Sequence, residues 1–216
     1  MTDTEFYQTL VTKTGKVSAL KVKDESLASL CYSLMMAQVT LNVLDALAFS
    51  EHKGEFDEVF HHYVPRSIVG QGQYLAQLNH VLDHFKPQNP SPYKTLTKAV
   101  FAAAKYLSPY ASYADYKAKV LEKCTDEKTT LSFLESFRLQ ASLPKMYFWK
   151  TCAFFYNQGI LEVPSLTSAS KDTLIEAFLL PDENVALYQK VIALSKANNV
   201  SVTEINQRLA KISAHA

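Results

Sequence analysis

The low glycine content is the most informative absence in this sequence, with only five glycines among 216 residues. Ordinary globular proteins contain about 7% glycine, and nucleotide-binding loops need it wherever the backbone must approach a phosphate. None of the patterns G-x-G-x-x-G, G-x-x-x-x-G-K-[ST] and G-x-S-x-G occurs. The sequence therefore disfavours the common classes of nucleotide-dependent enzyme.

Cysteine is also scarce. The three cysteines, Cys31, Cys124 and Cys152, are far apart, odd in number and never in a C-x-x-C pair. This pattern argues against a disulfide framework or a zinc knuckle and favours a reducing compartment. The first residues show no basic stretch followed by an apolar run, as a signal peptide would. We therefore expect a cytoplasmic location.

An excess of charge of one sign is missing too, because the net charge is only +1. The total therefore gives no general signal for nucleic acid or for an anionic membrane. Residues 26–44 carry no charge over 19 positions, which is close to a membrane-spanning length. Serine, threonine, glutamine and asparagine interrupt this stretch, and no cluster of Lys or Arg sets an orientation. We expect a central buried helix there, and no membrane partner.

Apolar residues make up 48% of the chain and recur at helical spacing along most of its length. The pattern predicts an all-α fold, either a multi-helix bundle or an orthogonal array of about eight to ten helices in a single domain, 1–216. The expected helices cover residues 24–53, 55–63, 67–85, 92–107, 112–124, 127–142, 145–158, 171–180, 183–198 and 202–214.

Two segments depart from this helical pattern. Residues 11–23 alternate apolar and polar side chains around Gly15, which predicts a small N-terminal hairpin or an extended arm. Residues 86–92 contain three prolines and predict a stiff linker, a possible subdomain boundary. Charge is segregated around that linker, with a net −6 over 24–62 and a net +5 over 86–123. These two regions could dock on each other or serve a partner.

Histidines cluster in one part of the chain, four of the six within 24 residues. On a helix, His80 and His84 lie one turn apart and can present two imidazoles to one metal ion. Glu58 and His61 could do the same from a preceding helix, in a helical hairpin turning at Pro65. The four side chains form a candidate Zn²⁺ or Fe²⁺ site, although the second Glu-x-x-His of a di-iron bundle is missing. Locally hydrogen-bonded or solvated imidazoles are the simpler interpretation.

A basic and aromatic stretch follows over 93–123. Lys94, Lys98 and Lys105 share one helical face, and neighbouring tyrosines could stack bases while ammonium groups meet phosphates. No arginine occurs between Arg66 and Arg138, whereas base reading favours arginine. A solvated lysine face over core tyrosines is the competing interpretation.

The C-terminal segment 191–209 resembles the helix-turn-helix unit of bacterial repressors, through its Asn-Val-Ser-Val turn and the amphipathic helix that follows. The resemblance implies DNA contacts from that second helix. Residues 171–216 carry five bases and five acids, so the region lacks the charge excess of DNA-binding domains. The candidate contact residues are Thr203, Asn206, Gln207 and Arg208.

No complete catalytic set emerges from these patterns. We therefore expect a non-enzymatic protein-interaction or regulatory module that binds a protein partner or self-associates, without a cofactor. The alternatives are a metal-dependent helical enzyme or sensor that uses the His/Glu cluster, and a nucleic-acid-binding protein that uses the lysine face or the C-terminal hairpin.

Overall fold

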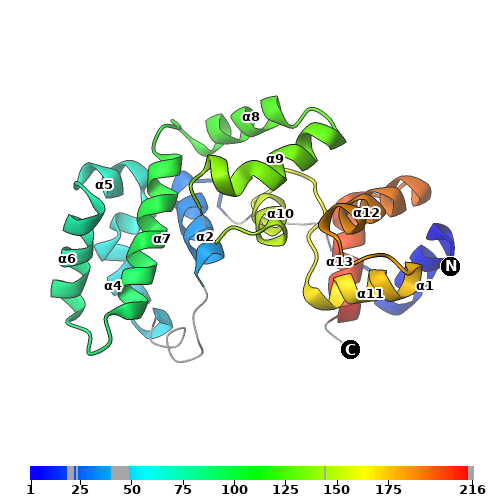
Figure 1. The fold of residues 1–216 in the computed structure, drawn as a ribbon, viewed down its shortest axis with the longest axis horizontal. Helices are drawn as coiled ribbons and strands as arrows, with labels where there is room; N and C mark the ends of the chain where they lie inside the picture. Colours follow the sequence, from blue (N-terminus) through cyan, green and yellow to red (C-terminus); the bar gives the residue numbers. More distant parts are fainter. Residues whose placement is uncertain (19–21, 23, 40–48, 144, 214–216) are drawn as a thin grey trace. The chain divides into compact units, whose positions relative to one another are not determined.

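The computed structural model describes residues 1–18, 22, 24–39, 49–143 and 145–213 (Figure 1). Within these ranges the chain forms twelve α-helices and one short 3₁₀ helix, and no β-strand. The all-α prediction is confirmed. The number of helices exceeds the expected eight to ten, because one helix was missed and predicted helices are broken into shorter ones.

The missed helix is α1 (Asp3–Thr14), which lies at the N-terminus. Thr2 and Glu5 form a capping box: the Thr2 hydroxyl accepts from the Glu5 amide at 3.2 Å, and the Glu5 carboxylate accepts from the Thr2 amide at 2.7 Å. Gly15 ends the helix with a φ of 58°. The hairpin predicted over 11–23 is wrong, because its first strand belongs to α1; residues 19–21 and 23 lie outside the described ranges.

The chain divides into two compact units. The terminal unit contains Met1–Val22 and Phe148–Ala216, and the central unit contains Lys23–Tyr147. The proline-rich segment 86–92, considered above as a subdomain boundary, joins two helices of the central unit.

The terminal unit consists of α1, α10 (Phe148–Asn157), α11 (Ser168–Phe178), α12 (Asn184–Asn198) and α13 (Val202–Ser213). The N-terminal helix α1 packs on α12 and α13, so the two ends of the sequence build one core (Figure 1). Phe6 and Leu10, one helical turn apart, supply the buried face of α1. Burying side chains of this size contributes about 1.5–3 kcal/mol each. The core consists of Phe6, Leu10, Leu166, Leu174, Leu187, Val191, Leu194, Val202, Ile205 and Leu209.

The central unit is built around α7 (Ser91–Leu107), which packs on α2 (Leu27–Gln38), α5 (Pro65–Gly70) and α6 (Tyr74–Phe85). The unit also contains α4 (Lys53–Val59), the 3₁₀ helix η1 (His61–Tyr63), α8 (Tyr113–Lys123) and α9 (Glu127–Gln140). Ala99, Ala103 and Ala104 are buried on α7, and such small side chains let neighbouring helices approach closely.

The central helix expected over 24–53 is present as α2, whose buried face includes Leu30, Leu34 and Met35. Residues 40–48 of that expectation lie outside the described ranges. No helix in the described part of the chain has the length and hydrophobicity needed to cross a bilayer.

Two predicted helices are interrupted at specific backbone positions. The helix expected over 67–85 is broken into α5 and α6, where Gly72 has a φ of 112°. The helix expected over 55–63 begins earlier, includes Gly54 in α4 and ends at Val59. Beyond it the chain turns left-handed through η1, with φ between 50° and 59° at each residue of that helix.

Candidate functional site

The central unit carries a pocket of about 570 Å³ beside α7. Its walls come from α7, the start of α6, the loop after α7 and the end of α9. Volumes in this range accommodate a small molecule or a few groups of a larger ligand. The lining residues are Tyr74, Lys98, Phe101, Ala102, Lys105, Tyr106, Pro109, Tyr110, Gln140, Ala141 and Ser142.

A second pocket of about 250 Å³ adjoins the first, because Lys98, Ala102 and Ser142 line both. We call the two pockets together the α7 groove. The smaller pocket brings in residues from the end of α2 and from the segment after α9. It is lined by Gln38, Thr95, Lys98, Ala99, Ala102, Ser142 and Lys145.

The helical register of α7 explains how one helix serves both the core and the groove. Lys98, Phe101, Ala102 and Lys105 stand at positions i, i+3, i+4 and i+7, so they share one face. Val100 is fully buried on another face, toward the core. The groove is therefore presented by a rigid helix that the core holds in place.

Among the described residues, cationic side chains line the groove and acidic ones do not. Lys98, Lys105 and Lys145 are exposed and contribute to its walls, whereas no Asp or Glu of the described ranges lines either pocket. Within the described part of the chain, none of these lysines forms an ion pair, whereas the nearby Lys119 pairs with Glu122 at 3.1 Å. The three ammonium groups are therefore available to an anionic ligand.

The aromatic wall of the groove is fixed by packing. The ring of Tyr106 lies 6.2 Å from Tyr110 and 6.0 Å from Tyr116, both at edge-to-face angles. The hydroxyls of Tyr106 and Tyr116 are 3.4 Å apart. Burial raises the pKa of both groups, so their hydroxyls stay neutral. A ligand would meet a preformed, uncharged aromatic surface.

Of the three lysines that the sequence analysis proposed as nucleic-acid contacts, two line the groove and one does not. Lys98 and Lys105 line it, whereas Lys94 is exposed one turn earlier on α7 and lines neither pocket. Lys145 and Gln38 were missed, because they reach the groove from segments distant in the sequence. No local pattern around either residue could have revealed them.

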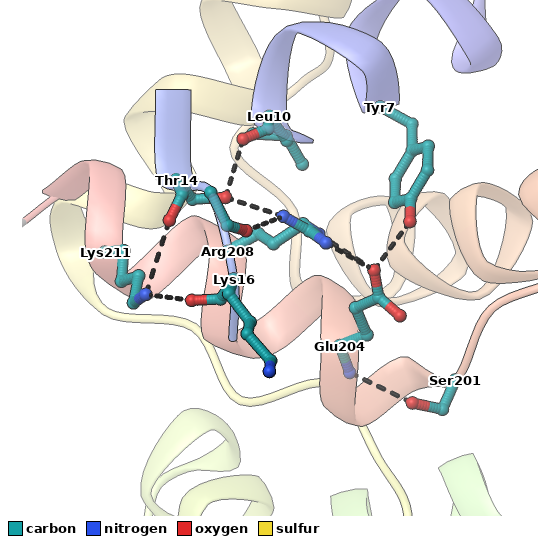
Figure 2. A network of polar contacts seen from close by, with 9 residues as sticks. Tyr7, Leu10, Thr14, Lys16, Ser201, Glu204, Arg208 and Lys211 are labelled. Atoms are coloured by element: carbon teal, nitrogen blue, oxygen red, sulfur yellow. Dashed lines mark hydrogen bonds and ion pairs between the residues drawn. The ribbon is translucent and has the colours of Figure 1, made fainter. Parts of the chain in front are cut away.

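Arg208 of the C-terminal hairpin points into its own unit (Figure 2). Its guanidinium donates to the Glu204 carboxylate at 2.7 and 2.9 Å, to the Thr14 hydroxyl at 2.8 Å and to the Gly15 carbonyl at 2.9 Å. The Tyr7 hydroxyl donates to the same carboxylate at 2.6 Å. This hydroxyl first, and Arg208 second, lower the pKa of Glu204 against the opposing effect of burial.

Asn206 is also used internally, because it is buried, donates to the Val163 carbonyl at 2.9 Å and accepts from the Ser165 amide at 3.0 Å. Thr203 and Gln207 are half-buried. The turn between α12 and α13 does form, with Asn199 left-handed at a φ of 50°. Two of the four predicted DNA contacts are therefore engaged in holding the terminal unit together.

The predicted metal-ligand set does not come together. Glu58, His80 and His84 are exposed, and no three His, Cys, Asp or Glu side chains of the described residues gather closely enough to hold a metal ion. The spacing from Glu58 to His61 assumed a continuous helix, whereas the chain turns left-handed at His61. His84 lies instead 3.6 Å from Glu55, which also bonds His52 at 2.8 Å. The two histidines, His52 first, lower the pKa of Glu55.

The left-handed turn borders a separate pocket of about 250 Å³, formed by α2, α4 and η1. Lys53 binds Asp57 there at 2.7 Å. The Tyr63 hydroxyl and Asp57 Oδ1 are buried and have no hydrogen-bond partner among the described residues. Burial raises the pKa of Tyr63 above its usual range. The pocket is lined by Asp24, Ala28, Ser29, Tyr32, Lys53, Asp57, His62 and Tyr63.

The three cysteines are free thiols. Burial raises the pKa of Cys31 to about 12 and also raises the pKa of Cys152 and of Cys124. Thiols in such surroundings stay protonated and are poor nucleophiles.

Comparisons with known proteins add no relative. No protein-family model matches the chain, and searches of curated proteins and of solved structures find no similar protein.

Proposed function

We propose that this chain is a non-enzymatic helical binding module whose α7 groove holds single-stranded nucleic acid. The observation that carries the proposal is a groove that combines three lysines with packed aromatic rings; among the described residues, these lysines form no ion pair and no acidic residue lines the groove. Proteins that bind single strands without sequence preference combine these two elements, cations along the backbone and rings under the bases.

The spacing of the lysines fits a phosphate backbone. Lys98 and Lys105 are seven residues apart on α7, which is about 10 Å along the helix axis. A stacked strand places a phosphate roughly every 3.4 Å, so the two ammonium groups cover about three nucleotides. Tyr106 and Tyr110 line the same groove and would supply the rings on which bases stack.

The lysine ammonium groups favour binding to the phosphate backbone over recognition of the base sequence. An ammonium group is a point charge with rotatable donors, whereas bidentate recognition of phosphates or of guanine needs an arginine. The described residues that line the groove include no arginine. Backbone attraction is therefore the main source of affinity.

The test measures binding of fluorescently labelled single strands of about 15 nucleotides by anisotropy. With three lysine contacts, the logarithm of affinity falls with the logarithm of salt concentration at a slope of about −2, which is a loss of roughly twentyfold between about 50 and 200 mM salt. The variant Lys98→Gln/Lys105→Gln reduces this slope to about −0.7 and weakens binding at the lower salt about tenfold.

The matched control is Lys123→Gln/Lys128→Gln, which removes the same charge from exposed lysines outside both pockets. We expect this control to bind close to wild type. Absence of any binding at low salt, or equal weakening by the two double variants, contradicts the proposal.

A protein partner is the second candidate function. Leu139 is 73% exposed and Tyr147 is 61% exposed, on either side in sequence of the groove residues Gln140–Ser142. An acidic protein segment with apolar residues could use both features. Salt-sensitive binding that single strands fail to compete would favour this partner over nucleic acid.

A further inference from the structure

Gln38 places an oriented amide at the smaller pocket of the α7 groove. It is the last residue of α2 and is only 5% exposed. Its Nε2 donates to the Leu34 carbonyl at 3.1 Å and to the Ala99 carbonyl at 3.3 Å. Because carbonyl oxygens only accept, the side chain must present its nitrogen to them, which fixes which end of the amide is oxygen.

The other end of that amide is an acceptor without a partner among the described residues. Gln38 Oε1 has no donor within the described part of the chain, and Gln38 lines the pocket. Lys98 on α7 and Lys145 in the segment after α9 line the same pocket and are exposed. The pocket therefore combines one buried amide with two exposed ammonium groups.

We propose that this pocket is a base subsite for uracil or thymine, whose ring N–H donates to Gln38 Oε1 while the carbonyl oxygens accept from Lys98 and Lys145. This inference rests on the nucleic-acid function proposed above. It adds one position of base preference to a strand that is otherwise held by its backbone.

The arrangement of donors and acceptors selects this class of base. The edge of uracil or thymine carries one N–H between two carbonyl oxygens, and the pocket offers one fixed acceptor with two cationic donors. Guanine presents two adjacent donors to a single fixed acceptor, adenine has no carbonyl oxygen for the ammonium groups, and cytosine has only one. A polar group left unpaired in a buried site costs affinity.

The first experiment uses the wild-type protein and changes only the ligand. Labelled oligothymidine is compared by anisotropy with oligocytidine, oligoadenosine and a strand of N3-methylthymidine. In N3-methylthymidine a methyl group replaces the hydrogen on the ring nitrogen, so this donor is lost. We expect oligothymidine to bind about fivefold or more tighter than each of the others. Equal binding of the methylated strand overturns the subsite while leaving the nucleic-acid function standing. Failure of every strand to bind overturns both.

The second experiment changes the protein. Gln38→Met keeps the length of the side chain and removes the acceptor, so we expect the preference for oligothymidine over the methylated strand to disappear. The control Gln71→Met, at an exposed residue outside the pocket, should keep the preference. A folded Gln38→Met protein that retains the full preference contradicts the inference. If this variant does not fold, the methylated strand on the wild-type protein decides the question.

Discussion

The cations of α13 in the terminal unit and those of α7 in the central unit are used in opposite ways. In the terminal unit, Arg208 is bound by Glu204 and Thr14, and Lys211 donates to the carbonyl of Lys16 at 2.6 Å (Figure 2). In the central unit, Lys98 and Lys105 have no acidic partner in the described part of the chain. The presence of a positive residue in the sequence therefore does not show whether it is available to a ligand: Arg208 and Lys211 join α13 to the N-terminal segment, whereas Lys98 and Lys105 of α7 line the groove.

The largest effect that sharpens this comparison is expected for Arg208→Met. The change removes several charge-assisted hydrogen bonds and leaves Glu204 without its cation, so we expect a loss of about 2–3 kcal/mol of unfolding free energy. Trp149, which packs against the core of the terminal unit, reports on that unit by fluorescence in urea unfolding. A loss below about 0.5 kcal/mol would mean that Arg208 is not a structural residue.

An intermediate effect is expected for Tyr7→Phe. The Tyr7 hydroxyl donates to the Glu204 carboxylate, and a hydrogen bond to a charged group contributes about 1.5 kcal/mol. The matched change in the central unit is Tyr63→Phe, which removes a buried hydroxyl that meets no hydrogen-bond partner among the described residues and should leave stability unchanged or slightly higher. Urea unfolding followed by circular dichroism compares the two variants. Equal losses of unfolding free energy in the two variants would show that the Tyr7 hydroxyl stabilises the fold no more than the Tyr63 hydroxyl does.

The smallest effect on stability is expected for Lys98→Gln/Lys105→Gln. Exposed lysines without an ion pair contribute little to folding, so the unfolding free energy should change by less than about 0.5 kcal/mol. The same variant loses affinity in the binding test above. A large loss of stability would place these lysines in the same structural class as Arg208.

Much of the fold follows from local sequence signals. The helices expected over 92–107 and 112–124 correspond closely to α7 and α8, because proline and a serine cap mark their starts: the Ser112 hydroxyl accepts from the Asp115 amide at 3.1 Å. The capping box of Thr2 and Glu5 is an equally local signal, and it starts α1, whereas the alternation after Val11 predicted an extended segment.

The candidate site was only partly predictable. Helical spacing alone places Lys98 and Lys105 on one face of α7, and the structure places both in the groove. Gln38 and Lys145 come from segments whose approach to α7 depends on packing. The predicted metal set failed for a related reason, since a left-handed turn at His61 changes the direction of the chain where the spacing argument assumed a helix.

The sequence by itself determined the helical class, most helix positions and the lysine face of α7, because caps, prolines and apolar periodicity act within a few residues of one another. Only the tertiary structure decided which cations are free and which are bound. Arg208 meets its partners Thr14 and Gly15 across more than 190 positions of sequence, and Gln38 meets Ala99 across 61. Such contacts depend on how helices pack, and no local pattern records them.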